Sequence, residues 1–231
     1  MTDLLASNYR TLTFDCYGTL IDWESGILEY LQPLLQSYGV HVIDDWVLEF
    51  FAECEPQIQA DGGTYRSVLG RVLLQFGTRL GFTATEDAQN GFANSIEYWH
   101  PFPDTVVALH ALSHQFELGV VSNVDHDLFA FSAQHLSVEF AHVITAQEVG
   151  TYKPDKAMFK AALAQSRGPV LHIAQSRFHD IAPANELGLD TVWINRETAR
   201  GGSGAAKPVN VEANWTFSSL AALAEAMNLM S

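Results

Sequence analysis

At 231 residues, the chain is long enough to bury one sizeable core, or a core with a small insert. Hydrophobic residues make up 48% of it and charged residues 17%, which excludes the composition of a disordered chain. The formal net charge of −15 argues against nucleic acids and anionic membranes as partners, because both bind to basic surfaces.

Cysteine usage and the lack of sorting segments indicate the compartment. Only two cysteines are present, as in proteins of reducing compartments. The N-terminus, MTDLLASNYR, has no positively charged region before an apolar run, and no apolar stretch reaches the length of a membrane span. We therefore expect a cytoplasmic protein.

The first predicted element is a buried strand at residues 11–14, which ends at a carboxylate, Asp15. Gly18 follows and lets the backbone turn sharply. Open α/β sheets bind their ligands at the carboxyl ends of the strands, which is where Asp15 would lie. An aspartate that ends a strand before a turn is also common, so Asp15 alone leaves catalysis open.

Residues 22–100 are predicted to be mostly helical. Apolar side chains recur at helical spacing in four stretches, the first of which carries Ile27, Leu31 and Leu35. Residues 59–63, QADGG, are typical of a loop between the second and third helices.

Beyond residue 101, predicted strands and helices alternate. Strands are expected at residues 118–122, 142–145, 170–174, 191–195 and 215–217, with helices between and after them. Such alternation implies a parallel sheet covered on both faces, a Rossmann-like doubly wound α/β fold. Residues 197–207 are predicted to form a surface loop.

The predicted organisation is an α/β core domain of residues 1–20 and 101–231, interrupted by a helical cap domain of residues 21–100. An insert that directly follows the strand ending at Asp15 is well placed to act as a lid.

Polar residues occur at three later strand ends or loops that would face Asp15. Ser122 and Asn123 end one strand and offer donors to a carboxylate or phosphate oxygen. Lys153 beside Asp15 would gain about 4 kcal/mol at roughly 4 Å and an effective dielectric near 20, which favours the ionised carboxylate. Residues 175–180, QSRFHD, follow another strand. Each group has an ordinary structural explanation, but their order forms a specific pattern.

The run DCYGTL, followed by SN, YKP and HD before a helix, resembles the haloacid dehalogenase superfamily along the whole chain. The form of these motifs, with a late VWINR, is similar to the type II 2-haloacid dehalogenase group. The resemblance implies a Rossmann-like core, a four-helix cap and an aspartate nucleophile, here Asp15.

Two residues separate this branch from the magnesium phosphatases of the same superfamily. The phosphatases carry a second aspartate two residues after the nucleophile, where this chain has Tyr17. One of their metal-binding carboxylates aligns with Gln175, an amide, whereas magnesium prefers carboxylate oxygens. We therefore expect no metal and no other cofactor.

The resemblance then implies displacement at carbon by Asp15, through an aspartyl ester that water hydrolyses. Lys153 would keep Asp15 ionised, and Asp180 would orient Lys153 or activate the water. Ser122 and Asn123 would bind the carboxylate of a small substrate. The full set of expected substrate-binding residues is Tyr17, Ser122, Asn123, Arg66, Ser176 and Phe159.

Several departures from the dehalogenase pattern leave the substrate open. Residues 46–55 lack the arginine that dehalogenases carry early in the cap, and Arg66 is the nearest cation that could replace it. Residues 175–177 replace a Ser-x-Asn, and Phe159 replaces a tyrosine. The alternatives are ring opening of azetidine-2-carboxylate, a magnesium phosphatase, and a non-catalytic binding protein. A homodimer is also kept open.

Overall fold

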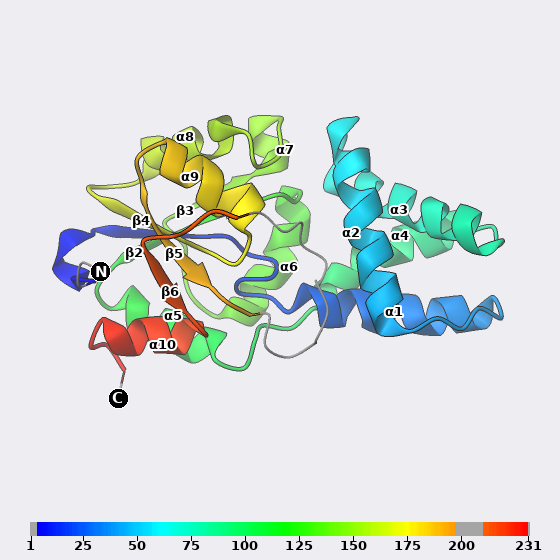
Figure 1. The fold of residues 1–231 in the computed structure, drawn as a ribbon, viewed down its shortest axis with the longest axis horizontal. Helices are drawn as coiled ribbons and strands as arrows, with labels where there is room; N and C mark the ends of the chain where they lie inside the picture. The colour runs from blue at the N-terminus through cyan, green and yellow to red at the C-terminus, as the bar shows by residue number, and fades with distance from the viewer. Residues whose placement is uncertain (1–3, 197–209, 231) are drawn as a thin grey trace.

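The computed structural model describes residues 4–196 and 210–230, which form a parallel sheet covered by helices on both faces (Figure 1). The strand order is β3-β2-β1-β4-β5-β6, and every neighbouring pair is parallel. The strands are β1 Thr11–Phe14, β2 Glu117–Ser122, β3 His142–Thr145, β4 Val170–Ala174, β5 Asp190–Ile194 and β6 Trp215–Phe217. The predicted doubly wound α/β fold class is confirmed.

Strand β1 lies in the middle of the sheet, because the chain builds outwards from it first on one side and then on the other. Phe14 is in register with Val120 of β2 and with Ile173 of β4. All four residues of β1 are buried, as expected of a strand covered on both faces. The carboxyl ends of β1, β2 and β4 therefore meet at the switch point of the strand order, where α/β proteins bind ligands.

The helices of the core cover opposite faces of this sheet (Figure 1). On one side α7, α8 and α9 lie near β2, β3 and β5, and on the other side α5 packs with α10. Their bounds are α5 Thr105–Ser113, α6 His126–Leu136, α7 Ala146–Val149, α8 Lys156–Gln165, α9 Ala182–Glu186 and α10 Leu220–Ala226. A short 3-10 helix, η1 Ala6–Asn8, precedes β1, and a π-helix, η3 Arg177–Ile181, leads into α9.

The predicted run of helices after β1 is also present, and it lies to one side of the sheet (Figure 1). It consists of α1 Trp23–Ser37, α2 Asp44–Ala60, α3 Tyr65–Leu80, α4 Glu86–Asn94 and η2 Ser95–Tyr98, here called the helical segment. Side-chain caps begin three of these helices: Asp22 accepts from Ser25 N, and Thr64 and Thr85 cap α3 and α4.

The two chain crossings between the helical segment and the sheet lie side by side. Ile21 forms an antiparallel bridge with Pro101, and Asp22 N donates to the His100 carbonyl oxygen over 2.9 Å. This pairing falls at the predicted boundaries, although the division into two domains stays a prediction.

The structure differs from the expected elements in a few places. Helix α2 continues to Ala60, so the loop after it begins two residues later than predicted. Helix α7 was not predicted because its four residues are too few for a periodic pattern. The predicted loop at residues 197–207 lies outside the described residues. Within residues 4–196 and 210–230, no helix is both long and apolar enough to cross a bilayer.

Candidate active site

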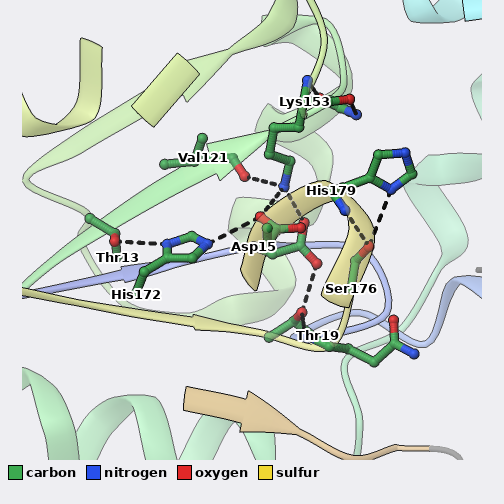
Figure 2. A network of polar contacts seen from close by, with 11 residues as sticks. Thr13, Asp15, Thr19, Val121, Lys153, His172, Ser176 and His179 are labelled. Carbon is green, nitrogen blue, oxygen red and sulfur yellow. Dashed lines mark hydrogen bonds and ion pairs between the residues drawn. The ribbon is translucent and has the colours of Figure 1, made fainter. Parts of the chain in front are cut away.

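A buried lysine lies between two carboxylates at the switch point of the sheet (Figure 2). Lys153 Nζ donates to Asp15 Oδ1 over 2.7 Å, to Asp180 Oδ1 over 2.8 Å and to the Val121 carbonyl oxygen over 2.8 Å. Lys153 is 2% exposed, Asp15 is 6% exposed and Asp180 is 0% exposed. All three ammonium protons are thus used within the protein.

Local structure explains how residues far apart in sequence reach this point. Asp15 directly follows β1, and Asp180 lies in the π-helix that follows β4. Lys153 precedes α8, and Asn123 at the end of β2 fixes its main chain: Lys153 N donates to Asn123 Oδ1, and Asn123 Nδ2 donates to the Lys153 carbonyl oxygen. The three charged residues that the sequence predicted to converge are therefore in contact.

The second oxygen of Asp15 binds a residue that was not among the expected ones. Thr19 Oγ1 donates to Asp15 Oδ2 over 2.6 Å and itself accepts from Gln175 N. The turn at Gly18, where φ is +90°, brings Thr19 back to the carboxylate. A Cβ at Gly18 would lie 3.1 Å from Trp23 Nε1, so glycine also leaves room for that side chain.

A fully buried histidine of β4, also unexpected, contacts Asp180 on one side and Thr13 on the other. Figure 2 shows its contact with Thr13. His172 Nε2 lies 3.1 Å from Asp180 Oδ1, and His172 Nδ1 lies 2.9 Å from Thr13 Oγ1. Because an ionised carboxylate only accepts, Nε2 carries the proton and Nδ1 accepts from the threonine hydroxyl. Thr13 and His172 are register partners on β1 and β4. Asp180 Oδ2 is buried and has no hydrogen-bond partner among the described residues.

The electrostatics give the two carboxylates different characters. Burial raises the pKa of Asp15, with a further contribution from Asp180, and together they outweigh the lowering effect of Lys153. Burial also acts on Asp180, but the Lys153 ammonium and His172 outweigh it and lower the pKa of that carboxyl. Burial opposes the charge of Lys153, yet the two carboxylates raise its pKa. Asp15 is therefore the more basic carboxylate and the better nucleophile.

These groups border a cavity of about 60 Å³, which is small against the several hundred Å³ of a typical cofactor or drug pocket. The expected site residues that line it are Asp15, Tyr17, Ser122, Asn123, Lys153, Ser176 and Asp180. A wider groove of about 880 Å³ shares Pro56, Lys153 and His179 with it. The cavity has room for a molecule of only a few heavy atoms.

Three of the expected substrate-binding residues that line the cavity differ in how their polar atoms are used. The Tyr17 hydroxyl is 2.9 Å from Ser132 Oγ. Ser176 Oγ accepts from His179 N over 3.1 Å. Ser122 Oγ is buried and has no partner among the described residues, so it remains available to a ligand.

Three further residues of the expected set contact other parts of the protein. Both polar atoms of the Asn123 carboxamide bind the main chain of Lys153, so Asn123 positions that lysine. Arg66 is absent from the described lining, because its guanidinium donates to Asn94 and, over 2.7 Å, to Asp127. Phe159 is also absent from it.

The structure explains why the side chains of Arg66 and Phe159 do not line the cavity. Tyr65 and Arg66 begin α3, and their main-chain N–H groups donate to the carboxylate of Asp125, which directly precedes α6. The Arg66 side chain therefore lies at the junction of α3 and α6. Phe159 lies on the buried face of α8, and its ring packs edge-on against His172 with 5.2 Å between the ring centroids.

A carboxyl group from the helical segment also lines the cavity, and the sequence pattern did not single it out. Glu55 of α2 is 7% exposed and accepts a hydrogen bond from Gln59 Nε2, one helical turn further on. The Tyr65 side chain also hydrogen-bonds to it. Burial raises the pKa of Glu55 to about 7. The available signal was an acidic residue on the buried face of a helix, beside Phe51 and Ile58.

Charged groups at the switch point of a parallel sheet are typical of α/β proteins that bind and transform ligands. A model of the family described as haloacid dehalogenase-like hydrolase matches residues 9–188. The chain therefore belongs to this family and is a hydrolase of it.

Three individual relatives share between 18% and 30% sequence identity with this chain. An (S)-2-haloacid dehalogenase of Pseudomonas putida is 24% identical over 204 residues, 81% of this chain and 86% of that protein. A pyrimidine 5′-nucleotidase of Escherichia coli is 30% identical over 142 residues, 56% of this chain and only 58% of the nucleotidase. The structure of L-2-haloacid dehalogenase from Xanthobacter autotrophicus gives a TM-score of 0.78 at 18% identity, covering 96% of this chain and 99% of that one.

The donor set does not fit a resident magnesium ion of the kind that the phosphatases of the superfamily use. The Lys153 ammonium already bridges Asp15 and Asp180. Where the phosphatases carry a further metal-binding carboxylate, this chain has the amide of Gln175. Among the described residues, no group of three His, Cys, Asp or Glu side chains is placed to hold a metal. Lys153 takes one oxygen of each carboxylate and Thr19 takes the second oxygen of Asp15, so Asp180 Oδ2 is the one oxygen of this pair left for a magnesium ion.

Proposed function

We propose that this hydrolase acts on a small 2-substituted carboxylic acid, without a metal, through a covalent ester on Asp15. The observation that carries the proposal is the contact of Asp15 with the Lys153 ammonium at the edge of a cavity of about 60 Å³. The alignment with an (S)-2-haloacid dehalogenase over 81% of the chain supports the same reaction class.

In the first step, an oxygen of Asp15 attacks the substrate carbon next to the carboxylate. A carbon–oxygen bond forms while the bond to the substituent breaks, and the leaving group departs with the electron pair. Burial makes Asp15 more basic and excludes water that would otherwise solvate it. Lys153 and Thr19 hold its two oxygens at 2.7 and 2.6 Å, which fixes the direction of attack.

In the second step, water attacks the side-chain carbonyl carbon of Asp15. Asp180 Oδ2, which has no partner among the described residues, accepts the proton of this water. The bond between the Asp15 carboxyl carbon and the ester oxygen breaks, and the proton passes to that oxygen, which leaves with the product as the hydroxyl of a hydroxy acid while the water oxygen stays on Asp15. Lys153 stabilises the charge that develops on the Asp15 oxygen during this attack.

Tyr17 supports carbon rather than phosphorus as the atom attacked. It occupies the place of the acid that protonates the leaving group in the phosphatases, and its hydroxyl pairs with Ser132. Burial raises the pKa of Tyr17 well above its ordinary value, so it is a poor proton donor at neutral pH. A substituent that leaves as a stable anion needs no such donor.

A substrate screen with and without EDTA tests the proposal. The compounds are 2-chloropropionate, fluoroacetate, azetidine-2-carboxylate and a set of phosphate esters. We expect turnover of at least one 2-substituted carboxylate, at the same rate in EDTA, and loss of this turnover in Asp15→Asn. Hydrolysis of phosphate esters only, lost in EDTA and restored by magnesium, would refute the proposal.

A further inference from the structure

The charges around the cavity do not suit a substrate that is only an anion. Its lining contains the carboxyl groups of Asp15, Asp180 and Glu55, and its only lysine or arginine among the described residues is Lys153. The three protons of that ammonium are all donated within the protein. A substrate carboxylate therefore meets three acidic groups and no unpaired lysine or arginine, and the one histidine of the described lining, His179, has its Nδ1 3.2 Å from Ser176 Oγ.

We propose that Glu55 determines the specificity of this site by binding a protonated nitrogen of the substrate, so that the substrate is a small amino or imino acid. This inference takes the reaction from the proposed function. It adds the class of substrate and the residue that recognises that substrate. The substituted carbon would carry, or lie next to, the charged nitrogen.

The position of Glu55 suits such a role. Gln59 and Tyr65 hold its side chain through hydrogen bonds, so the carboxyl group is fixed before a ligand enters. Tyr17, Trp23 and Tyr65 line the same cavity, and aromatic rings attract a cation through their faces. A carboxylate with aromatic neighbours is a typical environment for an ammonium group.

A second and independent feature would receive the other end of a zwitterion. Ser122 Oγ comes from the end of β2, is buried and has no partner among the described residues. Glu55 comes from α2 of the helical segment, so a carboxyl group and an unpartnered hydroxyl reach the cavity from different parts of the chain. An amino acid carries both complementary groups.

A purely structural role for Glu55 is the competing explanation. A glutamine would keep the size and the hydrogen-bonding capacity of the side chain within α2 without the cost of a buried charge. The two explanations differ in what Glu55→Gln does to ligand choice, because a structural role affects all ligands alike.

The test measures binding in the Asp15→Asn background, so that it does not depend on turnover. Calorimetry compares azetidine-2-carboxylate with cyclobutanecarboxylate, which has the same shape but lacks the nitrogen. At about pH 8, above the pKa of Glu55, we expect the amine ligand to bind at least ~10-fold more tightly. Adding Glu55→Gln should remove this preference, whereas Glu53→Gln, an exposed change on the same helix, should keep it.

Equal binding of the two ligands, no detectable binding of azetidine-2-carboxylate, or a preference that survives Glu55→Gln would each overturn the inference. Circular dichroism checks that the variants are folded. Because the measurement involves no chemistry, an enzyme that forms an aspartyl ester but shows no preference would refute this inference alone. A preference without any ester formation would refute the proposed function alone.

Discussion

The buried carboxyl of Glu55 should make the stability of the protein depend on pH in a way that one substitution removes. The pKa of this group is about 7 in the folded chain, against an ordinary value of 4.5. The folded state therefore binds more protons than the unfolded state between these values. The stabilising contribution of the protonated group is fully present below pH 4.5 and is lost as the pH rises through 7.

The magnitude follows from linkage. The interval from 4.5 to about 7, at about 1.4 kcal/mol per pH unit, gives a total loss of roughly 3 kcal/mol, of which ~2.5 kcal/mol falls between pH 5 and 8. This is a large share of the stability of a typical domain. Glu55→Gln keeps the shape of the protonated side chain but cannot titrate. The free energy of unfolding of this variant should therefore not show the decrease that Glu55 causes.

The assay is urea unfolding of the wild type, Glu55→Gln and Glu53→Gln at a series of pH values from about 5 to 8. Other carboxyl groups titrate in all three proteins and cancel in the differences. We expect the free energy of unfolding of the wild type to fall relative to Glu55→Gln by ~2.5 kcal/mol over this range. Glu53→Gln, exposed on the same helix, should follow the wild type. Parallel curves for the wild type and Glu55→Gln would refute the reasoning.

Two further predictions concern the hydrogen bonds behind Asp180 and the ion pair of Arg66. His172→Phe keeps the bulk beside Asp180 but removes a hydrogen bond to it, so we expect kcat to fall by about 10- to 100-fold with little change in KM, measured by steady-state kinetics. Thr13→Val, one contact further away, should cost less, and an equal or larger loss for Thr13→Val would contradict this order. Arg66→Gln should leave KM unchanged and lower the free energy of unfolding by about 1 kcal/mol, because Arg66 pairs with Asp127 and does not line the cavity. A tenfold rise in KM would mean that Arg66 binds the substrate and would contradict this prediction.

The sequence was sufficient to place the charged centre, for a reason that lies in the topology. Strand ends in a parallel sheet meet at one edge, so Asp15 and Asp180 could be predicted to converge without coordinates. The same logic gave the central position of β1 and the alternation of strands and helices. These features depend on periodicity and order, which a single sequence carries.

The remaining contacts could not be predicted because they depend on geometry between elements. The pairing of His172 with Thr13 needs the register of β1 on β4, which no local pattern specifies. Asn123 offers both donors and acceptors, and only the path of the loop before α8 assigns them to Lys153. Glu55 reaches the cavity because of how the helical segment packs on the core, so its position on α2 alone was not informative.

The central claim is that Asp15 becomes covalently attached to the substrate, and single-turnover hydrolysis in ¹⁸O-labelled water tests it most directly. Enzyme is mixed in excess over the best substrate of the screen, and both the product and the peptide containing Asp15 are analysed by mass spectrometry. We predict that the product of the first turnover contains unlabelled oxygen and that the label appears in the Asp15 carboxylate. Label in the first product, with none in Asp15, would mean that water attacks the substrate directly and would contradict the mechanism.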